Sequence, residues 1–274
     1  SSYTIPAVKT LAMVGLPAVI QQARQMGITT WGDDQAARFG LSLTLGGGEV
    51  TIADMAKLYG TFANNGVTIS LNPIVSIKNY KGEQLYSNPC IKSSDQCKGL
   101  RTLDPRIAYQ ITDILMDNSA RTPAFGANSV LYIPKQQVAV KTGTTNSLRD
   151  NWTFGYTSDR LVASWVGNND NTPMSRVASG ITGASPIWNT VMKELLDDTN
   201  PHKFASPSGL LKVRVCTQTG TLPCKACPST RDDYFIPGTE PKSFCTEEMF
   251  VPKDPNASPT PSPRDQLLRG VITQ

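Results

Sequence analysis

The sequence predicts an α+β fold in which helices flank an antiparallel sheet. Three β-rich segments follow one another closely, at 137–144, 152–157 and 161–166, and helical apolar spacing lies on both sides of them. The 274 residues are 39% apolar and 18% charged, which is enough to bury a sizeable core. The 21 glycines and 20 prolines indicate many turns and loops between the elements.

Before the sheet, apolar residues recur at helical spacing. This pattern predicts helices over 5–26, 51–62 and 106–116. Pro6 suits the first turn of the first helix, and the second helix ends at the turn signal Asn64-Asn65-Gly66. Between the last two helices, residues 73–86 are expected to form a hairpin around Lys81-Gly82.

A tight turn and a final helix complete the predicted fold. Ser158-Asp159 is expected to join the last two strands in a hairpin. A helix is predicted over 186–196. Its expected apolar face consists of Ile187, Trp188, Val191, Met192, Leu195 and Leu196.

The charge balance and the histidine content exclude several functions. The net charge of +4, spread over 26 basic and 22 acidic residues, is too small for a nucleic-acid-binding surface, so no nucleic-acid partner is expected. The chain has a single histidine, His202, which argues against most metal sites and against catalysis by histidine. We therefore expect no metal and no cofactor, and proton transfer by other side chains.

Six cysteines gather in two neighbourhoods of the sequence. Cys90 and Cys97 enclose a short loop that suits a local disulfide. The other four form either disulfides or a zinc site: Cys216, Cys224, Cys227 and Cys245. They contain one C-x-x-C pair where a zinc ribbon normally supplies two, so disulfides are favoured. Disulfides in turn favour an extracytoplasmic location.

The composition divides the chain into three parts. Residues 1–203 carry nearly all of the periodic pattern, 204–250 form a small cysteine-containing module, and 251–274 are typical of a Pro-rich tail. The longest apolar stretch, near 11–20, is too short to span a membrane.

One run of residues combines side chains suited to binding a peptide carboxylate. Lys141-Thr142-Gly143-Thr144-Thr145-Asn146 lies at the end of the first predicted strand, which places a lysine, hydroxyls and a glycine along a sheet edge. Glycine there lets a second extended backbone approach closely, as a peptide that adds itself as a strand requires. The tripeptide K-T-G alone is a weak signal, so the neighbouring sequence decides its meaning.

Further blocks of sequence accompany this run in a fixed order. They are Ser2-Tyr3-Thr4-Ile5-Pro6-Ala7, Gly46-Gly47-Gly48-Glu49 before a segment ending in Phe62-Ala63-Asn64-Asn65-Gly66, and Arg149-Asp150-Asn151-Trp152 before Gly155-Tyr156-Thr157. Together these blocks resemble the transpeptidase domain of class A penicillin-binding proteins, the bifunctional murein synthases of bacteria. The first block is similar to the S-x-N segment of that family, and residues 141–146 are similar to its K-T-G-T-T-N segment.

The resemblance implies a serine D,D-transpeptidase fold, related to that of β-lactamases, and acyl transfer. In this family a serine in an S-x-x-K motif attacks the D-Ala-D-Ala bond of a peptidoglycan stem peptide, and penicillins acylate the same serine. The implied partners are therefore stem peptides and β-lactams. The implied location is the extracytoplasmic face of the bacterial cytoplasmic membrane.

The resemblance also assigns roles to residues of this chain. Lys141, Ser2 and Thr144 are the expected catalytic residues: Lys141 supplies charge and, with Ser2, a proton path, and the Thr144 N–H is an oxyanion donor. The expected substrate-binding residues are Thr142, Gly143, Thr144 and Thr4, the two strand threonines holding the carboxylate through their hydroxyls.

Two departures from the family pattern bear on activity. No serine of the chain is followed by a lysine three positions later, so the nucleophile motif is absent and the chain is expected to be inactive alone. In the family this motif precedes the S-x-N segment. We therefore expect an N-terminally incomplete domain, with the nucleophile and the membrane anchor in an upstream part of the same parent protein. The second departure is Thr4, which stands where the family has asparagine.

Other hypotheses and expectations remain. The chain can instead be a catalytically dead peptidoglycan-binding module, or a structural module that interacts through its last four cysteines. Trp152 and Trp165 are expected in the core, and Glu49 is expected to meet free N–H groups at a helix start rather than act as a base. Without the nucleophile segment, an apolar trough is expected beside residues 138–144.

Overall fold

The computed structural model describes residues 2–32, 38–92, 97–145, 148–174, 181–196, 201 and 203–251. The chain divides into two compact units, Ser1–Ala205 and Ser206–Gln274. The predicted tail lies outside the described residues except for Val251, and so do His202 and Asn146.

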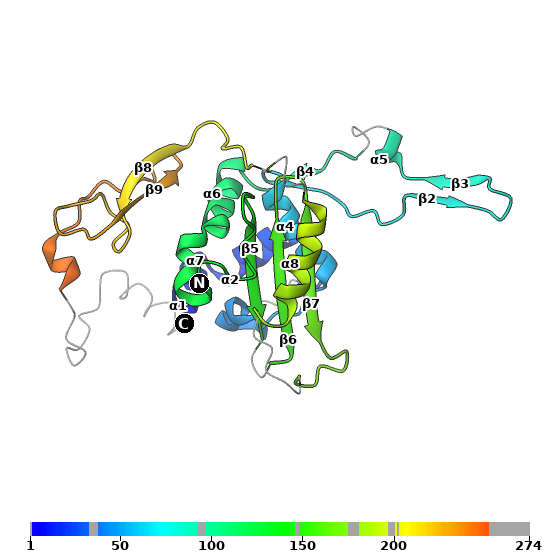
Figure 1. Ribbon diagram of the computed structural model, residues 1–274, viewed down its shortest axis with the longest axis horizontal. Helices are drawn as coiled ribbons and strands as arrows, with labels where there is room; N and C mark the ends of the chain where they lie inside the picture. Colours follow the sequence, from blue (N-terminus) through cyan, green and yellow to red (C-terminus); the bar gives the residue numbers. More distant parts are fainter. Residues whose placement is uncertain are drawn as a thin grey trace. The chain divides into compact units, whose positions relative to one another are not determined.

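The centre of the first unit is a three-stranded antiparallel sheet in the order β5-β6-β7 (Figure 1). β5 spans Ala139–Thr144, β6 spans Asp150–Tyr156 and β7 spans Leu161–Gly167, so the three predicted strands are confirmed. The turn between β6 and β7 is closed by the Thr157 N–H, which donates to the Arg160 carbonyl over 2.8 Å. Among the described residues β5 pairs only with β6, which makes it an edge strand.

Different helices cover the two faces of this sheet. Successive residues of a strand lie on opposite faces of the sheet, so Phe154 and Gly155 of β6 show what covers each face. Phe154 stacks on Tyr59 of α4 (Ile52–Ala63), with 4.9 Å between ring centroids. Gly155 faces Trp188 of α8 (Ala184–Leu195). The sheet is therefore enclosed between α4 on one face and α8 on the other.

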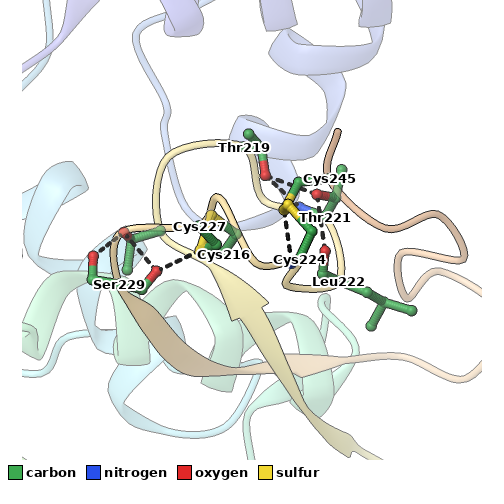
Figure 2. The surroundings of a disulfide bond; sticks show 9 residues. Cys216, Thr219, Thr221, Leu222, Cys224, Cys227, Ser229 and Cys245 are labelled. Atoms are coloured by element: carbon green, nitrogen blue, oxygen red, sulfur yellow. Dashed lines mark hydrogen bonds between the residues drawn. A yellow bond between two sulfur atoms is a disulfide. The ribbon is translucent and has the colours of Figure 1, made fainter. Parts of the chain in front are cut away.

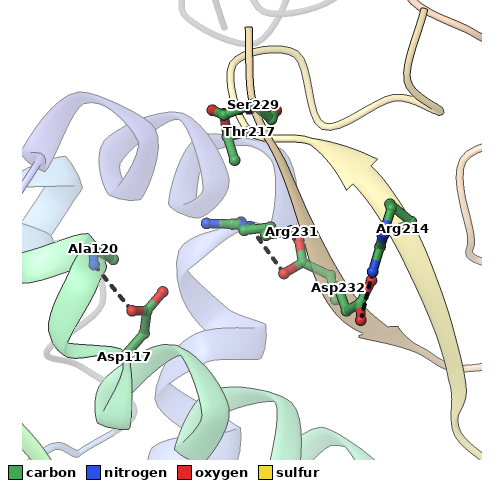
Figure 3. A network of polar contacts seen from close by, with 8 residues as sticks. Asp117, Ala120, Arg214, Thr217, Ser229, Arg231 and Asp232 are labelled. Carbon is green, nitrogen blue, oxygen red and sulfur yellow. Dashed lines mark hydrogen bonds and ion pairs between the residues drawn. The ribbon is translucent and has the colours of Figure 1, made fainter. Parts of the chain in front are cut away.

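The predicted helices α4 and α6 (Pro105–Met116) are confirmed, and local capping explains where they start. The Thr51 hydroxyl accepts from the Asp54 N–H at 3.0 Å, at the start of α4. Asp104 caps α6 by accepting from the Arg106 N–H at 2.8 Å. Hydrogen bonds from the Arg106 side chain and N–H lower the pKa of Asp104 to about 2. A third cap, Asp117, starts α7 (Asn118–Phe125) by accepting from the Ala120 N–H (Figure 3).

The single helix predicted over 5–26 was wrong, because this segment forms two helices. α1 spans Thr4–Val14 and α2 spans Leu16–Gln25, and the two are bent by 98°. Gly15 separates them with φ of +86°, a left-handed conformation that glycine adopts without strain, and α2 has a proline in its first turn. In the described parts of the chain, no single helix has the length and apolar character to cross a membrane, although this bent pair meets both criteria together.

The final helix is confirmed, but its predicted apolar face was partly wrong. Trp188 and Met192 are fully buried against the sheet. Ile187, Val191 and Leu195 are instead exposed by 52%, 44% and 45%. A sheet of three strands is narrow and contacts one stripe of the helix, so the neighbouring apolar stripe stays outside the core.

Two short strand pairs and a short helix follow α4 in the first unit. β1 (Val67–Thr68) pairs with β4 (Leu100–Arg101), and β2 (Ser76–Lys78) pairs with β3 (Gln84–Ser87) in the predicted hairpin. The hairpin projects away from the sheet (Figure 1). After the hairpin, the predicted disulfide joins Cys90 in α5 (Pro89–Lys92) to Cys97, with 5.4 Å between their Cα atoms.

The second unit is a small hairpin module held by disulfides. β8 (Leu211–Cys216) pairs with β9 (Thr230–Phe235), and a short 3-10 helix, η4, spans Glu247–Phe250. The four cysteines form two crossing bridges, Cys216–Cys227 and Cys224–Cys245 (Figure 2). The favoured disulfides are therefore present, and the zinc alternative is not. Across the hairpin, the Arg214 guanidinium donates to the Asp232 carboxylate over 2.9 Å (Figure 3).

Candidate active site

The run that starts at Lys141 forms the exposed end of edge strand β5. In the register of the sheet, Lys141 lies opposite Phe154 and Gly143 opposite Trp152. Lys141 and Gly143 therefore share the face that α4 covers. Thr142 and Thr144 lie on the alternate positions, and because β5 is an edge strand they still reach the rim of the same cavity.

The first block of the sequence meets this strand. The Lys141 ammonium donates to the Ser2 hydroxyl over 2.7 Å and to the Thr142 carbonyl over 2.6 Å. Ser2 lies two residues before the start of α1, and the fold places it next to β5. Burial lowers the pKa of Lys141, because removing the ammonium from water disfavours its charged form. The pair thus combines a hydroxyl with an amine that can release a proton more readily than an exposed lysine.

All six predicted site residues line one cavity of about 870 Å³. They are Ser2, Thr4, Lys141, Thr142, Gly143 and Thr144. The remaining wall is largely apolar and aromatic, and it comes from α4, from η1 (Gly40–Leu45) and from the sheet. Its side chains include Leu43, Leu45, Val50, Met55, Tyr59, Trp152, Phe154 and Trp165. The apolar trough expected beside residues 138–144 is thus present beside 141–144 only, because Val138, Ala139 and Val140 are buried in the core.

The aromatic wall corrects one expectation from the sequence. Trp152 and Trp165 were expected in the core, but both line the cavity and their ring centroids lie 6.1 Å apart. Trp152 also stacks on Phe154 at 5.7 Å, so the rings form a continuous surface along the sheet. The alternation of a strand shows which residues share a face, whereas the neighbouring elements decide whether that face is covered.

Glu49 lies at the cavity wall but is poorly suited to be a base. Its carboxylate accepts from the Arg38 guanidinium at 2.5 Å. A hydrogen bond from its own backbone N–H, together with Arg38, lowers the pKa of the carboxyl group. Its backbone carbonyl accepts from the Thr30 hydroxyl and the Trp31 indole N–H, at 2.7 and 3.1 Å. The described contacts of the Glu49 carboxylate are therefore with Arg38 and its own N–H, rather than with the N–H groups of the first turn of α4.

Sequence reasoning missed one charged residue of the cavity, Asp150. It is the first residue of β6, and its two carboxylate oxygens accept from Thr145 and from Trp165. Asp150 was part of a matching block of sequence, but nothing in that block indicated that its carboxylate faces the cavity. The last residue of the K-T-G-T-T-N segment, Asn146, lies outside the described residues.

Two known families match the chain. Residues 21–193 match the penicillin binding protein transpeptidase domain, and residues 206–249 match the C-terminal domain of penicillin-binding protein 1A. Among curated relatives, penicillin-binding protein 1A of Pseudomonas aeruginosa is 27% identical over 277 residues, covering 85% of this chain and 32% of that protein. The protein of the same name from Clostridium tetani is 28% identical over 196 residues, covering 70% of this chain and 24% of that protein.

A solved structure supports the same relationship. The crystal structure of penicillin-binding protein 1A from Haemophilus influenzae aligns with a TM-score of 0.72 and 26% identity, over 90% of this chain and 40% of that chain. A structure of penicillin-binding protein A from Mycobacterium tuberculosis, solved as an imipenem acyl-enzyme complex, aligns with a TM-score of 0.50 and 20% identity, which shows a shared fold. The chain spans between 24% and 32% of the length of these two curated relatives.

Proposed function

Because this chain belongs to the penicillin-binding protein transpeptidase family, we propose that it is the C-terminal part of a peptidoglycan D,D-transpeptidase. The parent protein cross-links stem peptides by serine acyl transfer on the extracytoplasmic side of the membrane, and β-lactams acylate the same site. One observation carries the proposal: the Lys141 ammonium meets the Ser2 hydroxyl at an open sheet edge, beside a cavity that can receive a peptide.

The edge of β5 suits an extended peptide substrate. A stem peptide that pairs with this edge as an extra strand would run along Lys141 to Thr144. A Cβ added at Gly143 would lie 3.5 Å from the Trp152 side chain, which is an ordinary contact. Packing within the fold therefore does not require glycine at this position. The close approach of a substrate backbone would explain why glycine stands at position 143.

The proposed chemistry assigns one task to each group at the site. The hydroxyls of Thr142 and Thr144 and the Lys141 ammonium hold the terminal carboxylate of the substrate. The Thr144 N–H donates to the oxyanion that forms when the carbonyl is attacked. Ser2 and Lys141 pass a proton to the departing D-alanine amine, a step favoured by the lowered pKa of Lys141. Thr4 lines the wall beside Ser2 and contacts the peptide there.

The nucleophile comes from another part of the parent protein. The sequence contains no serine followed by a lysine three positions later, and the matched relatives are much longer than this chain. We place the nucleophile-bearing segment in the apolar and aromatic trough next to Lys141. A segment seated there would cover Trp152 and Phe154 and bring its serine to the edge of β5. This placement explains why so many aromatic side chains line a cavity in this chain.

Labelling with a fluorescent penicillin tests the proposal. The full-length parent protein should be covalently labelled, and this chain by itself should not be. If neither is labelled but the chain still binds a D-Ala-D-Ala peptide, the chain is a peptidoglycan-binding module without catalysis, the alternative that the absent motif favours. Label on a serine of this chain alone would contradict the assignment of the nucleophile to another segment.

A further inference from the structure

The turn that follows β5 is closed by one reciprocal pair, Thr145 and Asp150. The Thr145 hydroxyl donates to Asp150 Oδ2 over 3.1 Å and accepts from the Asp150 N–H at 2.8 Å. The Thr145 N–H also donates to the Asp150 carbonyl, at 3.0 Å. Thr145 directly follows Thr144, so this pair fixes the chain one residue beyond the last group of the carboxylate anchor.

The second oxygen of the same carboxylate reaches the third strand. Asp150 Oδ1 accepts from the indole N–H of Trp165 at 2.9 Å. Thr145 follows β5, Asp150 begins β6 and Trp165 lies in β7. One side chain therefore ties together the ends of all three strands where they border the cavity, and all three residues line that cavity.

We infer that Asp150 is a positioning residue for acyl transfer: it holds the end of β5 so that Thr142 and Thr144 meet the substrate carboxylate. This inference rests on the function proposed above. Both carboxylate oxygens accept hydrogen bonds, one from Thr145 just after β5 and one from Trp165 of β7, so the ionised group is held in one orientation. An amide in its place would keep one acceptor and present a donor to the other position. A shift of the strand end by about 1 Å would misplace the hydroxyls that hold the carboxylate.

The other hairpin of the sheet offers a matched control. At the β6–β7 turn the Thr157 hydroxyl donates to Asp159 Oδ1 over 3.1 Å and accepts from the Asp159 N–H at 3.4 Å. This pair has the same reciprocal hydrogen bonds as Thr145 and Asp150, but the second Asp159 oxygen pairs with Arg160 over 2.8 Å and the pair is not part of the cavity wall. Substitution at Asp159 therefore reports on the loss of a turn-closing carboxylate without any effect on the anchor.

The experiment compares two acylating agents in the full-length parent protein. A penicillin with its free carboxylate uses the anchor, whereas its methyl ester does not. We define the ratio as the acylation rate with the free penicillin divided by the rate with its methyl ester. For Asp150→Ala we expect this ratio to fall about tenfold, which corresponds to about 1.4 kcal/mol. Asp159→Ala should leave the ratio unchanged. Thr145→Val should lower this ratio, whereas Thr145→Ser should leave it near the value of the unsubstituted protein, because only the hydroxyl is needed to bind Asp150.

A purely structural role predicts a different result. If Asp150→Ala slows both agents equally, or neither, the inference is overturned. Hydrogen exchange of residues 139–145 in this chain gives a second readout: exchange should accelerate in Asp150→Ala and stay unchanged in Asp159→Ala. Equal exchange in the two variants would also overturn it. Failure of the proposed function itself is distinguishable, because the unsubstituted parent protein would then take no penicillin label.

Discussion

The ammonium of Lys141 lies 2.7 Å from the hydroxyl of Ser2, although the two residues are 139 positions apart in the sequence. This contact joins the N-terminal end of α1 to the edge of the central sheet. It places an amine of lowered pKa beside a hydroxyl at the wall of a cavity. The proposed proton path depends on this one contact, so it can be tested by substituting either residue.

Removing either partner should abolish most of the acylation. In the full-length parent protein we expect Lys141→Met and Ser2→Ala each to slow penicillin acylation by about 10²-fold or more, the scale of a lost proton-transfer group. The two losses should be far from additive in the double variant, because both remove the same path. The exposed Lys193 on α8 provides a control, and Lys193→Met should react normally. Additive losses would argue against a shared path.

The dependence of penicillin affinity on pH should report the titration of Lys141. Burial lowers the pKa of this lysine below its ordinary 10.5, so its positive charge is present at lower pH and is lost as the pH rises through the lowered value. Affinity for a penicillin carboxylate should therefore be constant at low pH and decline before pH 10.5 is reached. The affinity of Lys141→Arg for the same penicillin, obtained from the concentration dependence of its acylation rate, should show no such decline over this range, because arginine stays charged. The methyl ester should show none in either protein.

Two glycines of the sheet should respond differently to a methyl group. Gly143→Ala should fold normally, since the new Cβ lies 3.5 Å from the Trp152 side chain. It should slow acylation in the parent protein, because the methyl group hinders the close approach of a substrate backbone to β5. Gly155→Ala places a Cβ 2.4 Å from the Trp188 ring in the core. We expect it to destabilise the first unit by about 1–3 kcal/mol, measured by denaturant unfolding. Normal acylation by Gly143→Ala would remove the argument for close substrate approach.

Reduction of the disulfides should affect the second unit most. Its two bridges link residues 11 and 21 positions apart in a very small module, whereas Cys90–Cys97 spans 7. Longer loops lose more entropy on closure, and each bridge of the second unit is expected to contribute about 2–4 kcal/mol. Limited proteolysis of the reduced full chain should cut residues 206–251 first and leave the sheet protected. Early cleavage within β5 to β7 would show that the first unit depends on the disulfides instead.

Local sequence patterns predicted most of the fold. The strands β5, β6 and β7 and the helices α4 and α6 follow from residue alternation and apolar spacing, which act over a few neighbouring residues. The same reasoning failed where two local rules conflicted. Apolar spacing continued through Gly15, whereas the left-handed backbone there, followed by a proline, separated α1 from α2.

By itself, the sequence determined the family, the strand that carries Lys141 to Thr144 and the absence of an S-x-x-K motif, because each of these is written in consecutive residues. Only the tertiary structure decided the rest. The last four cysteines pair as Cys216–Cys227 and Cys224–Cys245, and Ile187 is exposed although the adjacent Trp188 is buried. Trp152 lines a cavity, and both carboxylate oxygens of Asp150 accept hydrogen bonds. These features depend on how helices, strands and loops pack against one another, which the local patterns used for the prediction do not specify.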